Sequence, residues 1–309
     1  MFVAVFLGFV ALLPGFAKPD NLLTLLQNVA ILGILGLGMA VVVIGRGIDL
    51  SMVASLAVPP GLILSMVQGG HSAGTALACG VALSLAFGLV NGWLIAFAEV
   101  PPLFTTLASG LFLSGLGQSV LLPIETPSWG ASLDGLAWLG RGALAGVPMP
   151  VVTFAGTAIL VGFMLRRTRL GAFIYAIGDN PLAARASGAS VRPVLMAQYV
   201  LSAAIGAIAG AVMAASIGSL PTRIFTSSLI YDVILVVVLG GIGLTGGRGG
   251  VSNVLIGTLL IGTLLNGMTL LDVSFTVQNL IRGLILLIAI AAESFINPRN
   301  EETAQQGDL

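Results

Sequence analysis

Long apolar runs separated by short polar breaks dominate the sequence. A bilayer core of about 30 Å needs roughly 20 apolar residues in one helix, and runs of about 17 to 25 qualify. The pattern therefore predicts an all-α membrane protein with one domain over residues 1–296 and a polar tail at 297–309. Ten segments, some requiring a kink, are expected to cross the membrane: 1–16, 29–45, 50–67, 75–98, 103–122, 150–165, 194–217, 229–244, 251–270 and 276–296.

Two early segments carry residues that interrupt a helix. Gly45, Arg46 and Gly47 end the second segment, and Pro59 and Pro60 lie inside the third. Backbone freed from a helix at membrane depth has to be satisfied by protein or has to line a cavity. We therefore expect broken helices at these points, a feature typical of transport proteins.

The most polar interruption, residues 177–191, reads IGDNPLAARASGASV. Gly178 to Asn180 predict a turn, and Pro181 is favoured at the first position of a helix. Gly188 is a typical residue to end a helix. A short helix over residues 182–187 is therefore expected in this polar segment.

Arginines surround the polar segment and indicate which side of the membrane it faces. Short cytoplasmic loops carry an excess of Lys and Arg. We therefore expect both termini in the cytoplasm and a cytoplasmic loop at 166–193, between the sixth and seventh helices. This orientation places eight of the 12 basic residues inside: Arg46, Arg166, Arg167, Arg169, Arg185, Arg192, Arg248 and Arg299.

Composition agrees with the membrane class and excludes others. The chain of 309 residues is 57% hydrophobic and 8% charged, against roughly 25% charged in soluble domains. Its 42 glycines suit helices that pack closely in lipid. The formal net charge is zero, so no nucleic-acid partner is expected. With one Cys and one His, we expect no disulfide within the chain and no metal or haem site.

The sequence also indicates that any ATP-driven step needs another chain. The Gly-rich run at 240–250 lacks the Gly-Lys-Ser/Thr of a phosphate-binding loop. No loop between the apolar segments is long enough to bury the core of a catalytic domain. We therefore expect a transport subunit, not an enzyme.

Three charged residues fall within apolar segments: Asp49, Asp232 and Arg282. Such charges are costly in lipid unless they face a cavity or a partner. Tyr231–Asp232 also suits an intramembrane aspartyl protease, but a second Asp in a Gly-x-Gly-Asp context is missing. An ion-coupled carrier with Asp49 or Asp232 as a relay stays open, although a basic inner segment favours a permease gripped by an ATPase.

Five elements, in order along nearly the whole chain, resemble the membrane permeases of ribose/xylose-type sugar ABC importers. A match to one element alone is weak evidence for the family. Five matches in the expected order and spacing are specific evidence. They are GIDLS at 47–51, GLVNGWLIAFAEVPPLFTTL at 88–107, IGDNPLAARASG at 177–188, Asp232 with VVVLGGIGLTGGRGG at 236–250, and Asn266-Gly267 with residues 278–283.

The resemblance implies a ten-helix subunit of an importer with two permeases and two ATPases in the bacterial inner membrane. A periplasmic or extracellular sugar-binding protein would deliver the solute, and ATP and Mg would bind to the ATPase. The family's coupling helix, which docks on the ATPase, falls on Gly178, Asn180, Ala184, Arg185, Ser187 and Gly188. The expected lining of the solute path is Asp49, Ser51, Asn91, Asp232 and Asn266.

The chain departs from the family pattern at several positions. Arg46 replaces the first Gly of the Gly-Gly-Ile-Asp-Leu-Ser element, and Met52-Val53 stands where Val-Gly is common. Leu229 occupies the position of an acidic residue three before Asp232. These changes leave the solute open and raise the hypothesis of a second, paralogous permease as partner. The related branched-chain amino-acid permeases are the alternative within ABC importers.

Overall fold

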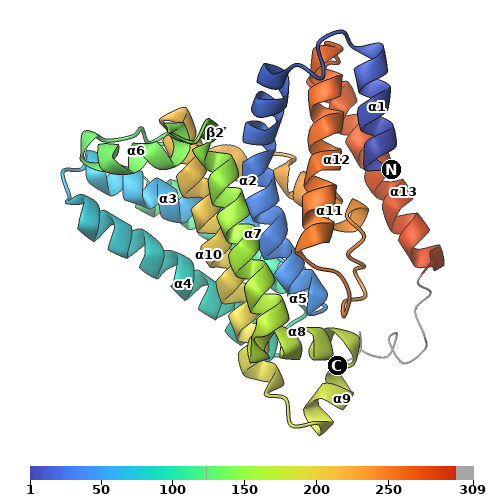
Figure 1. Cartoon of the computed structure of the whole chain (residues 1–309). Helices are drawn as coiled ribbons and strands as arrows, with labels where there is room; N and C mark the ends of the chain where they lie inside the picture. Colours follow the sequence, from blue (N-terminus) through green and yellow to red (C-terminus); the bar gives the residue numbers. More distant parts are fainter. Residues whose placement is uncertain (123, 297–309) are drawn as a thin grey trace.

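The computed structural model of the chain describes residues 1–122 and 124–296, so the predicted tail with Arg299 lies outside the described residues (Figure 1). Within that part, thirteen α-helices form a bundle. A small antiparallel hairpin consists of β1 (Ala143–Leu144) and β2 (Val147–Pro148), each two residues long. The helices are α1 Phe2–Leu12, α2 Pro19–Ile44, α3 Met52–Gln68, α4 Ala73–Ala96, α5 Pro102–Leu116, α6 Asp134–Arg141, α7 Met149–Arg167, α8 Arg169–Asp179, α9 Pro181–Ala186, α10 Val191–Ile217, α11 Leu229–Leu239, α12 Val251–Leu270 and α13 Phe275–Ile296.

Seven helices in the described part of the chain are long and apolar enough to cross a membrane: α2, α4, α5 with its continuation to Leu121, α7, α10, α12 and α13. Three shorter apolar helices, α1, α3 and α11, complete the set. Each of the ten predicted segments overlaps one of these ten helices. The helices support a multi-pass, largely α-helical membrane protein, whereas the number of crossings remains a prediction.

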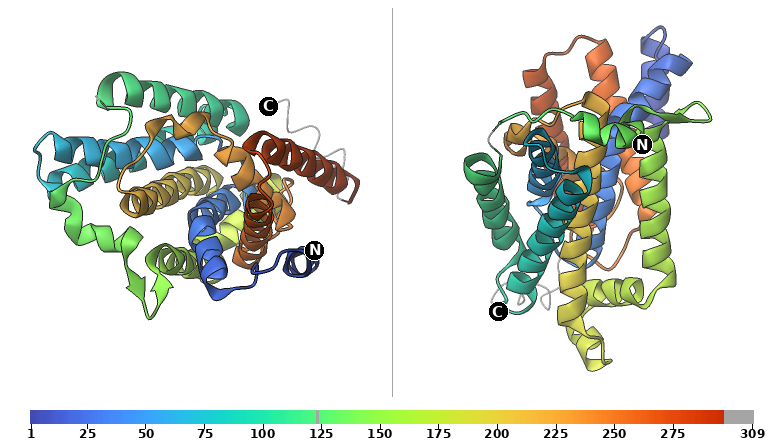
Figure 2. Two further views of the ribbon diagram at one scale, coloured as in Figure 1. Left: turned by 90° about the horizontal axis from the view of Figure 1, so that it is seen from above. Right: turned by 90° about the vertical axis from the view of Figure 1, so that its left-hand side faces the viewer.

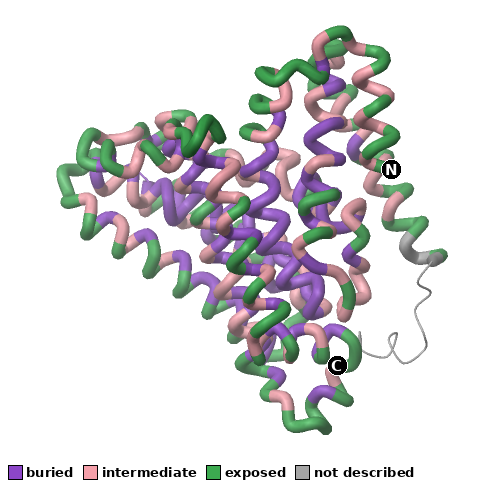
Figure 3. The backbone as a smooth tube through the Cα atoms, in the orientation of Figure 1, coloured by how far each residue is buried: buried purple, intermediate pink, exposed green. Residues whose placement is uncertain are grey.

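Helix α2 occupies the centre of the bundle (Figures 1 and 3). It begins at Pro19, ten residues before the predicted start at 29, because polar residues interrupt the leucines of its first turns and no continuous apolar run forms there. From Val29 to Gly45 all residues are buried except Ile31, which is partly buried. The later half of α2 is therefore surrounded by protein, with α10, α12, α7 and α11 packed around it.

Two glycines allow α4 to pack directly on α10. A side chain at Gly88 or Gly92 would bring its Cβ to 2.6 Å from the Cα of Val200 or Met196, respectively. The spacing of four residues places both glycines on one helix face. Small residues at such an interface let the backbones approach closely in lipid. The neighbouring Asn91 is buried beside this contact.

The expected break at Pro59 and Pro60 is wrong, because α3 runs without interruption through both prolines. Each proline removes one backbone donor within the helix. Glycines of adjacent helices approach the carbonyls of this region: a Cβ at Gly80 would lie 3.0 Å from the Pro59 carbonyl oxygen, and one at Gly210 would overlap the Leu56 carbonyl. Close packing of this kind allows proline inside a membrane helix.

The other expected break is present. Residues 45–51 leave the helical path between α2 and α3, and Arg46 has a positive φ of 67°. Beyond α7 the chain turns into α8, which lies across one end of the bundle, and then into the short α9 (Figures 1 and 2). Helix α8 was not predicted, since Gly178 and Asp179 were assigned to a turn and instead end this helix.

Candidate transport and coupling sites

Asp49 lies in the break between α2 and α3, and only 1% of its surface is exposed. Its carboxylate accepts hydrogen bonds from the Ser51 backbone N–H at 2.9 Å and from the Ser51 hydroxyl at 2.5 Å. The hydroxyl of Ser202, from α10, donates to the other carboxylate oxygen at 2.6 Å. Three neutral donors therefore stabilise this buried carboxylate.

Two further helices join this centre. Asn91 of α4 donates from Nδ2 to the Ser51 hydroxyl oxygen at 2.9 Å. The hydroxyl oxygen of Thr106, from α5, accepts from the Leu50 N–H at 3.1 Å. Its single proton is shared between the Pro102 carbonyl of its own helix at 2.8 Å and the Ile48 carbonyl at 3.2 Å. We call Asp49, Ser51, Asn91, Thr106 and Ser202 the Asp49 cluster.

The Asp49 cluster brings together three of the five predicted path residues, Asp49, Ser51 and Asn91. Ser202 and Thr106 were missed. Thr106 lies inside the quoted 88–107 element and offered a signal, whereas the Ser202 hydroxyl looks like any small polar residue in an apolar helix.

Buried polar groups beside the break have further hydrogen-bonding capacity. The Gln198 amide and the Tyr199 hydroxyl are fully buried and have no hydrogen-bond partner among the described residues. They lie against the backbone of Gly45 and Gly47, where an added Cβ would overlap them. The Asn91 Oδ1 atom is likewise without a partner in the described part. The centre of the molecule therefore offers both donors and acceptors.

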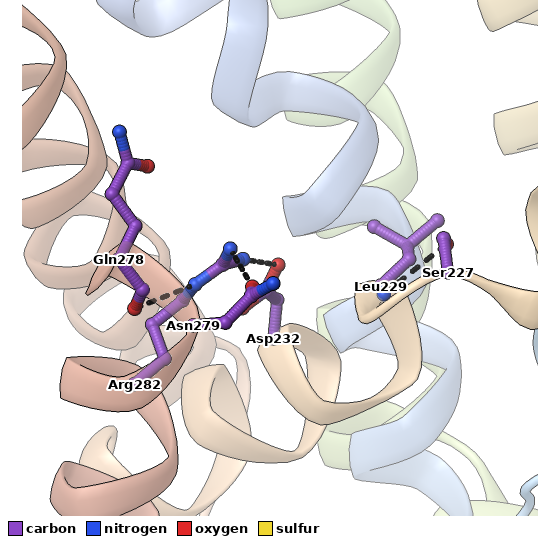
Figure 4. Close-up of polar contacts among 6 residues, drawn as sticks. All are labelled: Ser227, Leu229, Asp232, Gln278, Asn279 and Arg282. Carbon is purple, nitrogen blue, oxygen red and sulfur yellow. Dashed lines mark hydrogen bonds and ion pairs between the residues drawn. The ribbon is translucent and has the colours of Figure 1, made fainter. Parts of the chain in front are cut away.

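Asp232 belongs to a different place. Its carboxylate accepts from Arg282 Nη1 at 2.5 Å, and the two residues are 6% and 8% exposed (Figure 4). Arg282 also donates to Asn279 Oδ1 and, at 3.3 Å from Nε, to the Gln278 carbonyl. Its guanidinium carbon lies 5.7 Å from the centre of the Phe275 ring. This buried ion pair joins α11 to α13.

Asn266 lies in a third place. Its side-chain amide exchanges two hydrogen bonds with that of Asn21 in α2, at 3.0 and 3.2 Å. Asn21 also donates to the Phe16 carbonyl at 2.8 Å. Asn266 thus holds α12 to the start of α2. The five predicted residues occupy three separate hydrogen-bonded groups, because their spacing along the chain does not determine which helix each side chain faces.

The predicted short helix is confirmed as α9. The Asn180 side chain caps it by accepting from the backbone N–H groups of Leu182 and Ala183, each at 3.0 Å. Pro181 occupies the first turn and Gly188 has a positive φ of 84° after the helix. These features match the preferences of helix starts and ends.

The six residues predicted to contact an ATPase divide by exposure. Asn180, Arg185, Ser187 and Gly188 are exposed, whereas Gly178 and Ala184 are buried within the chain. Leu182 is 67% exposed and adds an apolar side chain that the prediction omitted. A hollow of about 360 Å³ lies at the start of α10, lined by Arg185, Ser190, Val191, Arg192 and Pro193.

Comparisons with known proteins identify the family. The family pattern described as "Branched-chain amino acid transport system / permease component" matches residues 21–290. The chain belongs to this family of transport permeases. Family membership argues against the ion-coupled carrier considered from the sequence.

Several relatives of the permease are named as sugar permeases. It is 36% identical to the ribose import permease protein of Bacillus subtilis (strain 168) over 279 residues, 90% of this chain and 85% of the relative. It is 33% identical to the L-arabinose ABC transporter permease protein of Azospirillum brasilense, over 99% of this chain and 88% of the relative. The galactofuranose transporter permease protein of Escherichia coli (strain K12) is 32% identical, with coverages of 90% and 80%. No solved structure matches the chain.

These relatives confirm the resemblance to sugar ABC permeases found from the sequence motifs. Within residues 1–122 and 124–296, no group of three or more His, Cys, Asp or Glu side chains is placed to hold a metal ion. The arrangement consists of a buried polar centre, a separate ion pair and the short helix α9 with Leu182 and Arg185 exposed. The buried polar centre offers groups that can bind a solute, and the exposed helix offers a surface for a partner protein.

Proposed function

We propose that the permease is the membrane subunit of an ABC importer for a sugar or sugar-like solute, with alternating access driven by separate ATPase subunits. The observation that carries this proposal is the similarity to ribose and L-arabinose permeases over nine-tenths or more of the chain. The proposal includes ten membrane crossings, both termini in the cytoplasm and a bacterial inner-membrane location. ATP and Mg would bind to the ATPase.

Helix α9 is the proposed coupling helix. It stands at one end of the molecule next to α8 (Figure 1), and Leu182 and Arg185 are exposed on it. An apolar side chain beside a guanidinium suits a groove on a partner protein, because Arg supplies directional hydrogen bonds. The proposed contacts on the ATPase are made by Asn180, Arg185, Ser187 and Gly188, while Ala184 and Gly178 support the helix from within.

The Asp49 cluster is the proposed polar part of the solute path. Its hydroxyl, amide and carboxylate groups are of the kinds that bind sugar hydroxyls. The remaining partners of the importer are a second permease subunit, identical or paralogous, and an external sugar-binding protein. Asp232 and Asn266, each paired with a residue of another helix, are assigned a bracing role beside the path.

A branched-chain amino-acid solute is the second candidate, favoured by the description of the matching family pattern. A branched-chain amino acid carries an ammonium and a carboxylate, which call for paired charges in the path. The Asp49 cluster supplies one carboxylate and no cation. We therefore rank a sugar first.

Uptake measurements distinguish these functions. The permease, reconstituted with its ATPase and sugar-binding protein partners, is expected to import one labelled pentose, hexose or polyol in proportion to ATP hydrolysis. Arg185→Glu is expected to retain ATP hydrolysis and lose uptake at least tenfold. Uptake of leucine but no sugar would support the second candidate. Uptake that continues without ATP would contradict both.

A further inference from the structure

Three segments that are distant in sequence meet where α2 ends. They are residues 44–47, residues 178–179 at the end of α8, and residues 245–247 in the loop between α11 and α12. The Gly247 N–H donates to the Ile44 carbonyl at 2.8 Å. A Cβ at Gly178 would lie 3.0 Å from the Gly247 Cα and would overlap the Ile44 carbonyl. We call this contact the three-segment junction.

Arg46 ties the three-segment junction together. Its Nε donates to the Thr245 carbonyl at 2.9 Å, and its Nη2 donates to the Asp179 carbonyl at 3.1 Å. Asp179 is the last residue of α8, so its carbonyl lacks a partner within that helix. A cation at this position also interacts favourably with the negative end of the α8 dipole. One guanidinium thus bridges α2, α8 and the loop at 245–247.

The backbone of Arg46 is in the left-handed region, with φ of 67°. This conformation is unfavourable for a residue with a Cβ and free of that penalty for glycine. The family element that this sequence resembles has glycine at the position. The arginine therefore accepts backbone strain, and the two carbonyl contacts offset it. Arg46 in place of the family's glycine therefore has a physical reason, because its side chain makes a connection that glycine cannot make.

The connection lies between the two proposed functional sites. On one side, Asp179 is followed directly by Asn180, which caps α9. On the other side, Arg46 is three residues from Asp49 in the same break. Tyr175 of α8 strengthens the contact with the loop by donating from its hydroxyl to the Gly249 carbonyl at 2.8 Å. A continuous set of contacts therefore connects α9 and α8 to the break that carries Asp49.

We propose that Arg46 is a positioning residue that transmits movement of α9 to the Asp49 cluster and sets how tightly ATP hydrolysis is coupled to uptake. This role rests on the proposed importer function, whereas the junction itself exists independently of it. Arg46→Gly removes the bridge and also relieves the backbone strain, so loss of folding is not expected. Arg46→Lys retains one cationic donor group and is expected to recover part of the bridge.

The first experiment measures amide hydrogen exchange of the full-length permease in lipid nanodiscs. Arg46→Gly is expected to raise exchange at residues 178–187 and 245–249 at least tenfold, with Arg46→Lys between it and the wild type. Arg248→Ala is the matched control, because Arg248 is an exposed arginine in the same loop. Equal exchange in Arg46→Gly and wild type would overturn the proposed bridge.

The second experiment measures sugar uptake per ATP hydrolysed in the complex with the ATPase and binding protein. Arg46→Gly is expected to keep the ATPase bound and to lower this ratio three- to tenfold, while Arg46→Lys restores part of it. An unchanged ratio would overturn the transmitting role. If the wild-type complex imports no sugar at all, the importer proposal fails, and the exchange experiment still decides whether Arg46 holds the junction.

Discussion

Asp49 and Asp232 are both buried aspartates in an apolar chain, at 1% and 6% exposure, yet the protein accommodates them differently. Asp49 receives hydrogen bonds from neutral donors at the centre of the bundle. Asp232 pairs with Arg282 on α13. The protein thus stabilises one buried carboxylate by converging dipoles and the other by one opposite charge.

The two solutions suit different positions. The Asp49 cluster joins several tightly packed helices, so donors are available from many directions. Helix α13 lies at the edge of the molecule, with 6% of its most apolar window buried, against 83% for α2 (Figures 1 and 3). Few neighbours of α13 are therefore placed to offer dipoles to Asp232, and Arg282 supplies an opposite charge instead.

The largest expected effect breaks the ion pair. Arg282→Leu leaves Asp232 as a buried charge without its partner and is expected to lower the free energy of unfolding by about 3–5 kcal/mol. The measurement is denaturant unfolding of the purified permease in detergent. The double variant Asp232→Leu/Arg282→Leu is the control and is expected to recover most of the loss, because no unpaired charge remains. A double variant as unstable as the single one would contradict the explanation.

The next largest effect is expected when one of the hydrogen-bond donors to Asp49, the Ser202 hydroxyl, is removed. Ser202→Ala deletes a hydrogen bond to a charged group and is expected to cost about 1.5–3 kcal/mol in the same unfolding measurement. Ser202→Thr retains the hydroxyl and serves as the conservative comparison. A loss for Ser202→Ala as large as that for Arg282→Leu would mean that the remaining two donors cannot stabilise Asp49.

A smaller effect is expected where no charge is involved. Asn266→Ala removes the neutral amide pair with Asn21, which retains its contact with Phe16. A net loss of about 1 kcal/mol is expected, typical of neutral hydrogen bonds. Thr269→Ala on the same helix, with an exposed hydroxyl bonded within its own turn, is the control. A loss above that for Ser202→Ala would remove the distinction between charged and neutral groups.

The smallest effect concerns the hydroxyl of Tyr175 in α8, the helix that precedes α9. Tyr175→Phe removes the bond to the Gly249 carbonyl and is expected to cost about 0.5–1 kcal/mol. Burial raises the pKa of the Tyr175 phenol, and the nearby Arg166 charge opposes this shift. The phenol therefore stays protonated below its ordinary pKa of about 10, so the difference between variant and wild type should be constant from about pH 6 to 8. A difference that disappears within this range would contradict the assignment.

Local chemistry allowed part of this structure to be predicted from the sequence. Asn180, Pro181 and Gly188 define α9 through contacts a few residues apart, and Gly45 to Gly47 mark the break before Asp49. Three of the predicted path residues also converge, since two sequence elements that resemble the family carry them. Prediction of α9 and of the break succeeded because the deciding interactions are short-range, whereas the role of the converging residues in a solute path stays a prediction.

The remaining features depend on which helix faces meet. The pairing of Asp232 with Arg282 spans 50 residues, and that of Asn21 with Asn266 spans 245. In lipid, apolar periodicity does not distinguish a helix face that meets protein from one that meets lipid. The same uncertainty applies to Pro59 and Pro60, whose helix is uninterrupted and is closely approached by glycines of α4 and α10.

The order of Asp232 and Arg282 along the chain also bears on biosynthesis. A ribosome delivers Asp232 to the membrane before it has synthesised α13, so the negative charge is present first and the positive charge follows. Insertion of α13 thereby brings an arginine to a site that already holds its counter-ion. Until α13 has been synthesised, Asp232 lacks the arginine that pairs with it.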